Sequence, residues 1–346
     1  MVFRKPADLP RQKSMNCLMY PMKSRVIILF VILGLFGCQS HSTAKIPVSV
    51  TPHAFKVALL LPRAVNADSW DRAGYDGLSL VEKELNAKVA YTAAIPEADF
   101  EKVFRQYAID GYDFIIGHGN QFAASAVKVA AQFPHTAFAI TGKYEGNNSN
   151  LGSLSLREGE MAYLFGAIAA IKTKTKRVGY LGGEDNISQR EIITLYKRGV
   201  QALDPTVQVS TDLVGNFTDA AKAEQLAQKQ INNGADIIFV LAGAAGMGVH
   251  AQAQQAGIFT LAWIEDLNYL APRAILTSNV QNIAKMLLYG ATLAKRGQWE
   301  GKQYKFGLAE GVQFLAPFRG LVSTAEERRI DSVRKDILSG KIDTVP

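Results

Sequence analysis

The sequence contains little cysteine and little histidine. Its 346 residues include two cysteines, Cys17 and Cys38, and five histidines. Both cysteines precede the region in which we expect folded structure, so that region has no disulfide and no thiolate to hold a metal. The histidines are not paired at a ligand spacing, which argues against a zinc site. We therefore expect a fold that its hydrophobic core stabilises, with no metal and no cofactor.

Sequence motifs of common catalytic chemistry are also missing. The chain has no Gly-x-Ser-x-Gly elbow, no P-loop and no His-Glu-x-x-His zinc motif. The segment Gly243–Gly248 is spaced G-x-x-G-x-G, which differs from the dinucleotide fingerprint G-x-G-x-x-G. We predict that the protein is not an enzyme and has no catalytic residues.

An uncharged apolar run, Val26–Phe36, follows Lys23 and Arg25 and leads through Gly37 to Cys38. A basic start, an apolar stretch and a small residue before the processing point are the parts of a secretory signal. The run has 11 residues, whereas a permanent membrane-spanning helix needs about 20. The sequence therefore predicts export of the chain.

The tetrapeptide Leu35–Cys38 resembles the lipobox of bacterial lipoproteins, in which the cysteine takes a lipid and becomes the first mature residue. Phe36 is bulkier than the residue usual at its position, and an ordinary signal peptide with a chance cysteine is the alternative. We expect residues 1–21 to be an artefact of start-codon assignment, residues 22–37 a signal peptide, and residues 38–55 a flexible tether. The expected location is the cell envelope, lipid-anchored and facing the periplasm or the exterior, on either membrane.

Charge and composition describe a globular chain without a basic face. The formal net charge is +7, but residues 1–37 carry six of the 38 Lys and Arg residues and one of the 31 Asp and Glu residues. The 309 residues from Cys38 onward have 32 basic and 30 acidic side chains, a net charge of +2. Nucleic-acid binding needs clustered basic side chains, so we exclude it. The length suits two lobes, and we expect a monomer.

Apolar, strand-like runs alternate with amphipathic segments along the chain. Phe55–Leu61 has the length and character of a strand buried on both faces, as in a parallel sheet. The alternation predicts an α/β protein with two lobes, each a parallel sheet flanked by helices. We expect lobe one at residues 56–172 plus 305–346 and lobe two at residues 173–304, with Phe306–Phe314 as a strand returning to lobe one. Ligands bind such sheets at the carboxyl ends of the strands.

Two aromatic residues stand in loops that follow predicted strands. Trp70 follows the first strand, and Phe217 follows a strand of the second lobe. Aromatic faces from opposite lobes suit a flat heterocycle, with each stack contributing about 1 kcal/mol. Asp266 follows the strand that carries Trp263, where a carboxylate can accept hydrogen bonds from a ligand. Core or capping roles for the aromatics and a turn role for Asp266 are the alternatives.

Several segments resemble the basic membrane protein family of substrate-binding lipoproteins, which includes the purine nucleoside receptor A proteins. The resemblance covers about Lys56–Pro346 and implies a two-lobed type I periplasmic-binding fold. It also implies an ABC importer whose permease lies in the inner membrane, with a purine base or nucleoside as ligand. The matching segments are Gly111–Gly117, Lys174–Tyr180, Gly234–Phe239, Tyr269–Pro272, Leu276–Ser278, Gly307–Gly311 and Ile337–Ile342.

The resemblance extends to ligand-binding positions. Its stacking aromatics fall on Trp70 and Phe217, and the aromatic of the loop before the third helix falls on Phe122. Its glycine-rich loop in the second lobe is Gly243–Gly248. The complete predicted ligand-binding set is Ser69, Trp70, Phe122, Thr141, Phe217, Gly243, Ala244, Trp263, Asp266 and Gln281.

The chain departs from the family at several polar positions. Acids of the nucleoside binders are replaced by Ala67 (beside Asp68), Thr141 and Ile264, and a lysine is replaced by Gln281. A buried hydroxyl left without a partner costs about 1–3 kcal/mol, so we expect a free purine base to bind at least as tightly as its nucleoside. The alternative function is a signalling or assembly lipoprotein that kept the binding fold and no longer feeds a transporter.

The lipobox resemblance predicts the behaviour of Cys38→Ser. Without the thiol, no lipid can be attached, so the variant should lose lipid labelling and leave the membrane fraction. Metabolic labelling with a fatty acid and fractionation of the native and variant chains measure this. A variant that keeps its labelling and its membrane association would refute the lipid anchor.

Overall fold

Strands and helices alternate along the chain, as the sequence predicts. The computed structural model describes residues 54–66 and 69–346. The predicted leader, signal peptide and lipid-anchor residue Cys38 lie outside the described residues, as does most of the tether. Residues 52–346 belong to one compact unit.

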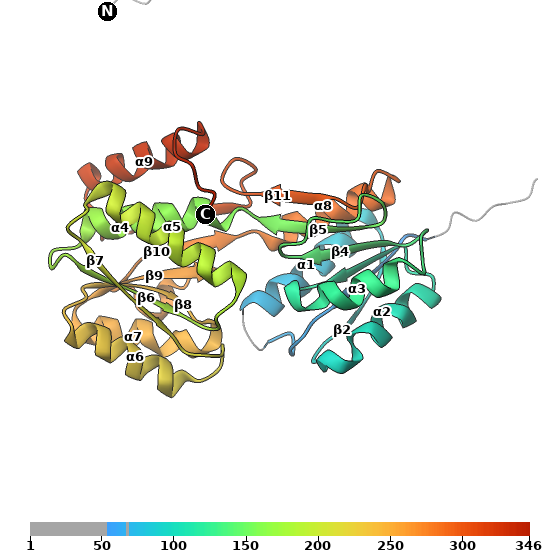
Figure 1. The fold of residues 1–346 in the computed structure, drawn as a ribbon, viewed down its shortest axis with the longest axis horizontal. Helices are drawn as coiled ribbons and strands as arrows, with labels where there is room; N and C mark the ends of the chain where they lie inside the picture. Colours follow the sequence, from blue (N-terminus) through green and yellow to red (C-terminus); the bar gives the residue numbers. More distant parts are fainter. Residues whose placement is uncertain (1–53, 67–68) are drawn as a thin grey trace, which may run out of the picture. The chain divides into compact units, whose positions relative to one another are not determined.

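The first sheet is entirely parallel (Figure 1). Its strand order is β11-β5-β4-β3-β1-β2. Apart from Lys56, the central strands are apolar and buried, which is the pattern of strands covered on both faces. Its strands are β1 (Lys56–Leu60), β2 (Lys88–Thr92), β3 (Phe114–Gly117), β4 (Ala137–Thr141), β5 (Leu151–Leu156) and β11 (Gln303–Phe306).

The second sheet repeats this order, β12-β10-β9-β8-β6-β7, and only the short β12 among its described strands runs antiparallel. In both sheets the first strand lies between the second and the third, so the strand order reverses there. Such a reversal opens a crevice at the carboxyl ends of the strands. The strands are β6 (Arg177–Gly182), β7 (Gln208–Leu213), β8 (Ile237–Leu241), β9 (Phe259–Ile264), β10 (Ile275–Gln281) and β12 (Gln313–Leu315).

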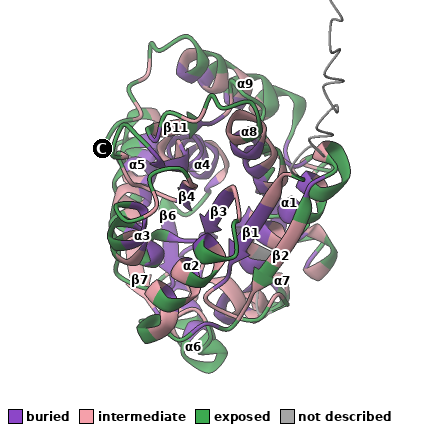
Figure 2. Ribbon diagram, turned by 90° about the vertical axis from the view of Figure 1, so that its right-hand side faces the viewer, coloured by how far each residue is buried: buried purple, intermediate pink, exposed green. Residues whose placement is uncertain are grey.

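Helices cover both faces of each sheet, and the strands between them are largely buried (Figure 2). On the first sheet, α1 (Ser69–Leu85) and α8 (Ile283–Lys295) pack on one face, and α2 (Phe100–Ile109) and α3 (Ala123–Ala130) on the other. On the second sheet, one face carries α4 (Glu158–Lys172), α5 (Ile187–Leu203) and α9 (Thr324–Leu338). The other face carries α6 (Ala220–Asn232) and α7 (Met247–Ala256). The predicted two-lobed α/β class is confirmed.

Two helices cross from one sheet to the other. Helix α4 follows β5 of the first sheet but packs against α5 and α9 of the second. Helix α8 follows β10 of the second sheet but packs against α1 of the first. Because residues 52–346 form one compact unit, the lobe boundaries at residues 172 and 304 stay a prediction.

The expected single strand Phe306–Phe314 is wrong. The chain instead ends β11 at Phe306 in the first sheet and begins β12 at Gln313 in the second. The intervening turn contains Gly311 with φ of +61°, a left-handed conformation that glycine adopts without steric cost. The turn sends the chain to the neighbouring sheet.

Helices α4 and α5 pack backbone to backbone through a pair of glycines. A Cβ at Gly199 would overlap the carbonyl oxygen of Tyr163, and a Cβ at Gly166 would overlap the carbonyl oxygen of Tyr196. Both tyrosines are buried. Backbone cannot move aside as a side-chain end can, so these positions set the closeness of the two helices.

This packing predicts that Gly199→Ala destabilises the fold. The added methyl must push α4 from α5, and overpacking of this kind costs about 1–3 kcal/mol, more than the roughly 1 kcal/mol that alanine gains in helix propensity. Urea denaturation measures the free energy of unfolding. Gly248→Ala is the matched control, because its Cβ would meet only the end of the flexible Glu224 side chain. Equal stability of the two variants would contradict the prediction.

Candidate functional site

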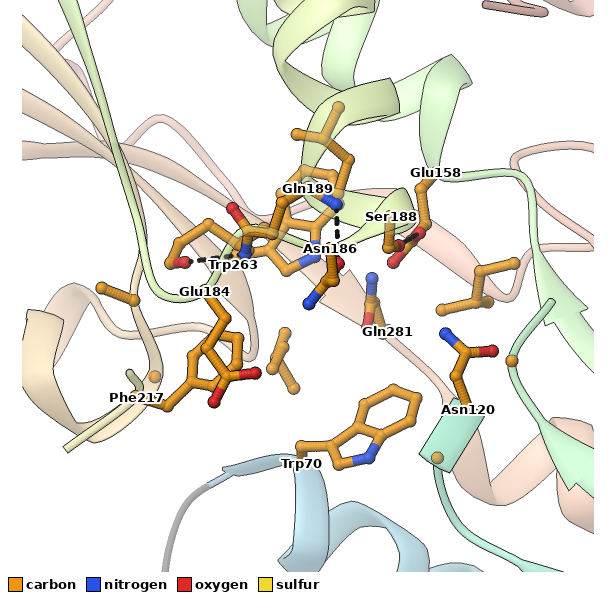
Figure 3. Close-up of a pocket in the computed structure, with 18 of the residues that line it drawn as sticks. Trp70, Asn120, Glu158, Glu184, Asn186, Ser188, Gln189, Phe217, Trp263 and Gln281 are labelled. Carbon is orange, nitrogen blue, oxygen red and sulfur yellow. Dashed lines mark hydrogen bonds between the residues drawn. The ribbon is translucent and has the colours of Figure 1, made fainter. Parts of the chain in front are cut away.

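A cavity of about 700 Å³ lies where the carboxyl ends of the two sheets face each other (Figure 3). Its wall consists of segments at or after the ends of β1, β3, β4 and β5 of the first sheet, and of β6, β7, β8, β9 and β10 of the second. Pockets for small ligands have volumes of roughly 300–1,000 Å³. The cavity therefore has the size and the position of a ligand site in an open α/β sheet.

Trp70 lines the cavity from the first turn of α1. Behind it, the ring of His118 stacks on the indole, with centroids 4.3 Å apart and planes inclined by 14°. His118 Nε2 lies 2.9 Å from the Trp70 carbonyl oxygen, and Nδ1 lies 2.8 Å from Thr141 Oγ1. Thr141 also lines the cavity at the end of β4, so these three residues connect α1, β3 and β4.

Phe217 lines the cavity from the second lobe, in the loop after β7. Its ring lies directly over Gly183, where a Cβ would overlap the ring carbons. A Cβ at Gly243 would lie 3.2 Å from Phe217 Cβ, and the Phe217 carbonyl accepts a hydrogen bond from the Ala245 N–H at 2.9 Å. The absence of side chains at Gly183 and Gly243 therefore leaves the space that the Phe217 side chain occupies. Phe217 and Trp70 both point into the cavity (Figure 3).

Other predicted residues of the second lobe also line the cavity. Gly243 and Ala244 lie in the 3₁₀ turn after β8. Trp263 lies near the end of β9 and packs against Phe165 and Phe239, with ring centroids 5.4 and 5.2 Å away. Trp263 is 7% exposed, so it forms a fixed wall of the cavity.

Gln281 is the last residue of β10 and lines the cavity while 6% exposed. Its Nε2 has no hydrogen-bond partner among the described residues. A buried amide N–H without a partner costs about 1–3 kcal/mol. A ligand that supplies an acceptor at this place removes that cost.

Sequence reasoning missed several polar residues that line the cavity. Asn120 lies in the turn after β3, and its Oδ1 accepts from the Lys143 N–H at 2.6 Å. Asn186 caps α5 through a 3.0 Å bond from the Gln189 N–H to its Oδ1. In Figure 3 both asparagines point into the cavity. Their position just after predicted strands was the signal that could have found them.

A carboxyl group also borders the cavity. Glu158, at the start of α4, accepts a hydrogen bond from the Ser188 hydroxyl of α5, and both residues line the cavity. Burial raises the pKa of the Glu158 carboxyl, while the Ser188 hydrogen bond and the nearby Lys143 ammonium act in the opposite direction. The carboxyl is thus easier to protonate than an exposed glutamate.

The basic groups of the cavity wall are held in ion pairs. Arg63 Nε lies 2.8 Å from the carboxylate of Asp71, which is fully buried. Lys143, after β4, pairs with Glu191 of α5 and so connects the two lobes. Burial lowers the pKa of Lys143. The positive charges of Arg63 and Lys143 are therefore balanced by acids, while the carboxyl groups of Glu158 and Glu184 also line the cavity.

Two predicted ligand residues lie away from the cavity. Phe122 ends the 3₁₀ turn Asn120–Phe122 and is fully buried in the core, 4.0 Å from Phe100 between ring centroids. Asp266 pairs with Arg319 at 2.5 Å on the surface. Of the remaining positions, the side chain of Ser69, and Ala67 and Asp68 altogether, lie outside the described residues.

The described residues give no sign of a metal centre or of a membrane-spanning helix. No three His, Cys, Asp or Glu side chains in this part of the chain are placed to share a metal ion. None of its helices has the length and apolar character to cross a bilayer. A wall of aromatic faces, amides and carboxyl groups suits reversible binding of a flat, polar-edged molecule.

Comparisons with known proteins agree with this arrangement. The transcriptional activator protein med of Bacillus subtilis is 26% identical over 317 residues, covering 91% of this chain and 96% of its own. The ABC transporter nucleoside-binding protein BmpA of Lactococcus lactis is 26% identical over 359 residues, covering 94% and 99%. A solved ABC transporter solute-binding protein of Aeropyrum pernix has a TM-score of 0.74 at 20% identity, covering 84% of this chain and 92% of that one. That likeness shows the shared fold.

The family follows from a match over most of the described chain. The family model Bmp, described as ABC transporter substrate-binding protein PnrA-like, matches residues 54–343. The resemblance inferred from the sequence is thereby confirmed. The protein belongs to the Bmp family of PnrA-like ABC transporter substrate-binding proteins.

Proposed function

We propose that the protein is a lipid-anchored receptor that binds a purine base or nucleoside between its two lobes and delivers it to the permease of an ABC importer. The observation that carries this proposal is the pair Trp70 and Phe217, which line one cavity from different sheets. Flat heterocycles bind between aromatic faces because each stack contributes about 1 kcal/mol beyond the buried area. A relative with 26% identity is named a nucleoside-binding protein.

The hydrogen-bonding groups of the cavity support a neutral heterocycle. Gln281 brings a buried N–H without a partner in the described chain, and a purine ring nitrogen or carbonyl is a suitable acceptor. Trp263 supplies an apolar wall. Arg63 and Lys143 are already paired with acids, which argues against an anionic ligand such as a nucleotide.

A second candidate is a signalling or assembly lipoprotein that no longer feeds a transporter. The observation that favours it is the relative named a transcriptional activator protein, which matches over 91% of this chain. Under this alternative, ligand binding in the cavity would be weak or absent. Direct binding measurements therefore separate the two functions.

The stacking model predicts the effect of Trp70→Ala and Phe217→Ala. Each variant loses one aromatic face and the area it buries, so purine affinity should fall about tenfold, or about 1.4 kcal/mol. Isothermal titration calorimetry with adenine, guanine, hypoxanthine and their nucleosides measures the change. Tyr269→Ala is the control, because Tyr269 is 66% exposed and outside the cavity. Native affinity in both cavity variants would remove the stacking model.

The polar groups of the cavity predict which purine is preferred. Thr141 is hydrogen-bonded to His118, Ile264 is apolar, and the Glu158 carboxyl is bonded to Ser188. Since Thr141 and Ile264 stand where acids are expected and Gln281 where a lysine is expected, ribose hydroxyls find fewer charged partners here, and a free base should bind at least as tightly as its nucleoside.

Calorimetry on matched pairs, such as adenine with adenosine and guanine with guanosine, decides the preference. A nucleoside favoured tenfold or more would contradict it and would show that the missed polar residues serve the sugar. Glu158→Gln, which removes the charge and keeps the shape, would then tell whether this carboxyl is the acceptor.

A further inference from the structure

His118 lies behind the cavity, with Trp70 between it and the ligand space. Its side chain is fully buried and follows β3, whereas Trp70 lines the cavity. The two rings stack at 4.3 Å and are nearly parallel. A ligand on Trp70 would therefore rest on a ring that is itself backed by a second ring.

The hydrogen bonds of His118 fix its orientation. A carbonyl oxygen can only accept, so Nε2 carries a proton and donates to the Trp70 carbonyl at 2.9 Å. In the neutral imidazole Nδ1 then accepts from the Thr141 hydroxyl at 2.8 Å. One ring thus contacts the Trp70 side chain, holds the Trp70 backbone, and is itself held by the end of β4.

Helix α1 provides the space for this ring. Gly74 lies one turn after Trp70, and a Cβ there would lie 2.7 Å from His118 Cδ2. The His118 backbone is fixed by its N–H bond to the Leu60 carbonyl at 2.9 Å, and its ring is fixed by the bonds to Trp70 and Thr141. The imidazole therefore cannot move aside, and a side chain at position 74 would displace it.

We propose that His118 is a positioning residue for ligand binding: it holds the Trp70 indole as a rigid stacking platform without touching the ligand. The proposal rests on the proposed function for its effect on affinity, and on geometry alone for its effect on Trp70. A platform that is already immobilised loses less side-chain freedom when a ligand stacks on it, which favours binding. Loss of His118 should release the indole and weaken the stack.

The first experiment needs no ligand. The chain has three tryptophans, so 5-fluorotryptophan labelling gives three ¹⁹F resonances, and Trp70→Phe assigns one of them to Trp70. His118→Leu and Gly74→Ala should shift and broaden this resonance, because the stacked ring and its ordering are lost. Gly77→Ala is the matched control on the same helix, since its Cβ would lie 2.9 Å from Leu287 Cδ2, away from His118. An unchanged Trp70 resonance in either variant that folds overturns the proposal.

The second experiment measures purine affinity by calorimetry. His118→Leu and Gly74→Ala should weaken binding about threefold to tenfold, and Gly77→Ala should not, although circular dichroism melting will show a loss of stability in all three. The His118→Leu substitution is then made in a Trp70→Phe background, where a ring remains to bind the ligand. The loss of purine affinity caused by His118→Leu should differ between the two backgrounds, because the effects of substitutions at contacting residues do not add. The same fold-loss in both backgrounds would show that His118 acts independently of Trp70 and would overturn the proposal.

These two experiments separate the proposal from the function on which it rests. If no purine binds to the native protein, the proposed function fails, while the ¹⁹F resonances still decide whether His118 orders Trp70. If purines bind and the Trp70 resonance does not respond, the function stands and the positioning role falls.

Discussion

Parallel strand pairing is the constraint on which this molecule depends. Parallel neighbours need a crossover connection, so every segment that follows a strand emerges at the same edge of its sheet. The two sheets share the order of their first five strands, and these edges face each other across one cavity. Trp70, Phe217 and Gln281 are far apart in the sequence, and they meet because each lies at such an edge and the two edges face each other.

Close packing of small residues then fixes how the site is shaped. Gly183 and Gly243 leave room for the Phe217 ring, as Gly74 leaves room for His118 behind Trp70. Gly74 and Gly183 do not line the cavity themselves, whereas Gly243 does. The binding surface is therefore determined as much by the missing side chains under the aromatics as by the aromatics themselves.

Family membership and ligand identity rest on different residues. The family match extends over residues 54–343, since packing of the sheets and helices involves most of the chain. The ligand depends on a few side chains at strand ends, and relatives of similar identity carry names as different as a transcriptional activator and a nucleoside-binding protein. Function is thus decided by the site rather than by the fold. In this chain the ion pairs Arg63–Asp71 and Lys143–Glu191 leave aromatic faces, amides and the carboxyl groups of Glu158 and Glu184 as recognition groups of the cavity.

The sequence by itself determined the α/β class and the alternation of strands and helices, because periodicity and apolar runs are local properties. Strand β5 at Leu151–Leu156 and helix α4 at Glu158–Lys172 follow directly from such runs. It also placed Phe217 in a loop after a strand, whereas Trp70, expected in a loop, lies in the first turn of α1. Tertiary structure alone decided that α4 packs on the second sheet, that Phe122 lies in the core while Asn120 lines the cavity, and that His118 backs Trp70. These outcomes depend on the direction of each side chain at its turn and on the distant surface that it contacts. A pattern along the sequence contains no information on either.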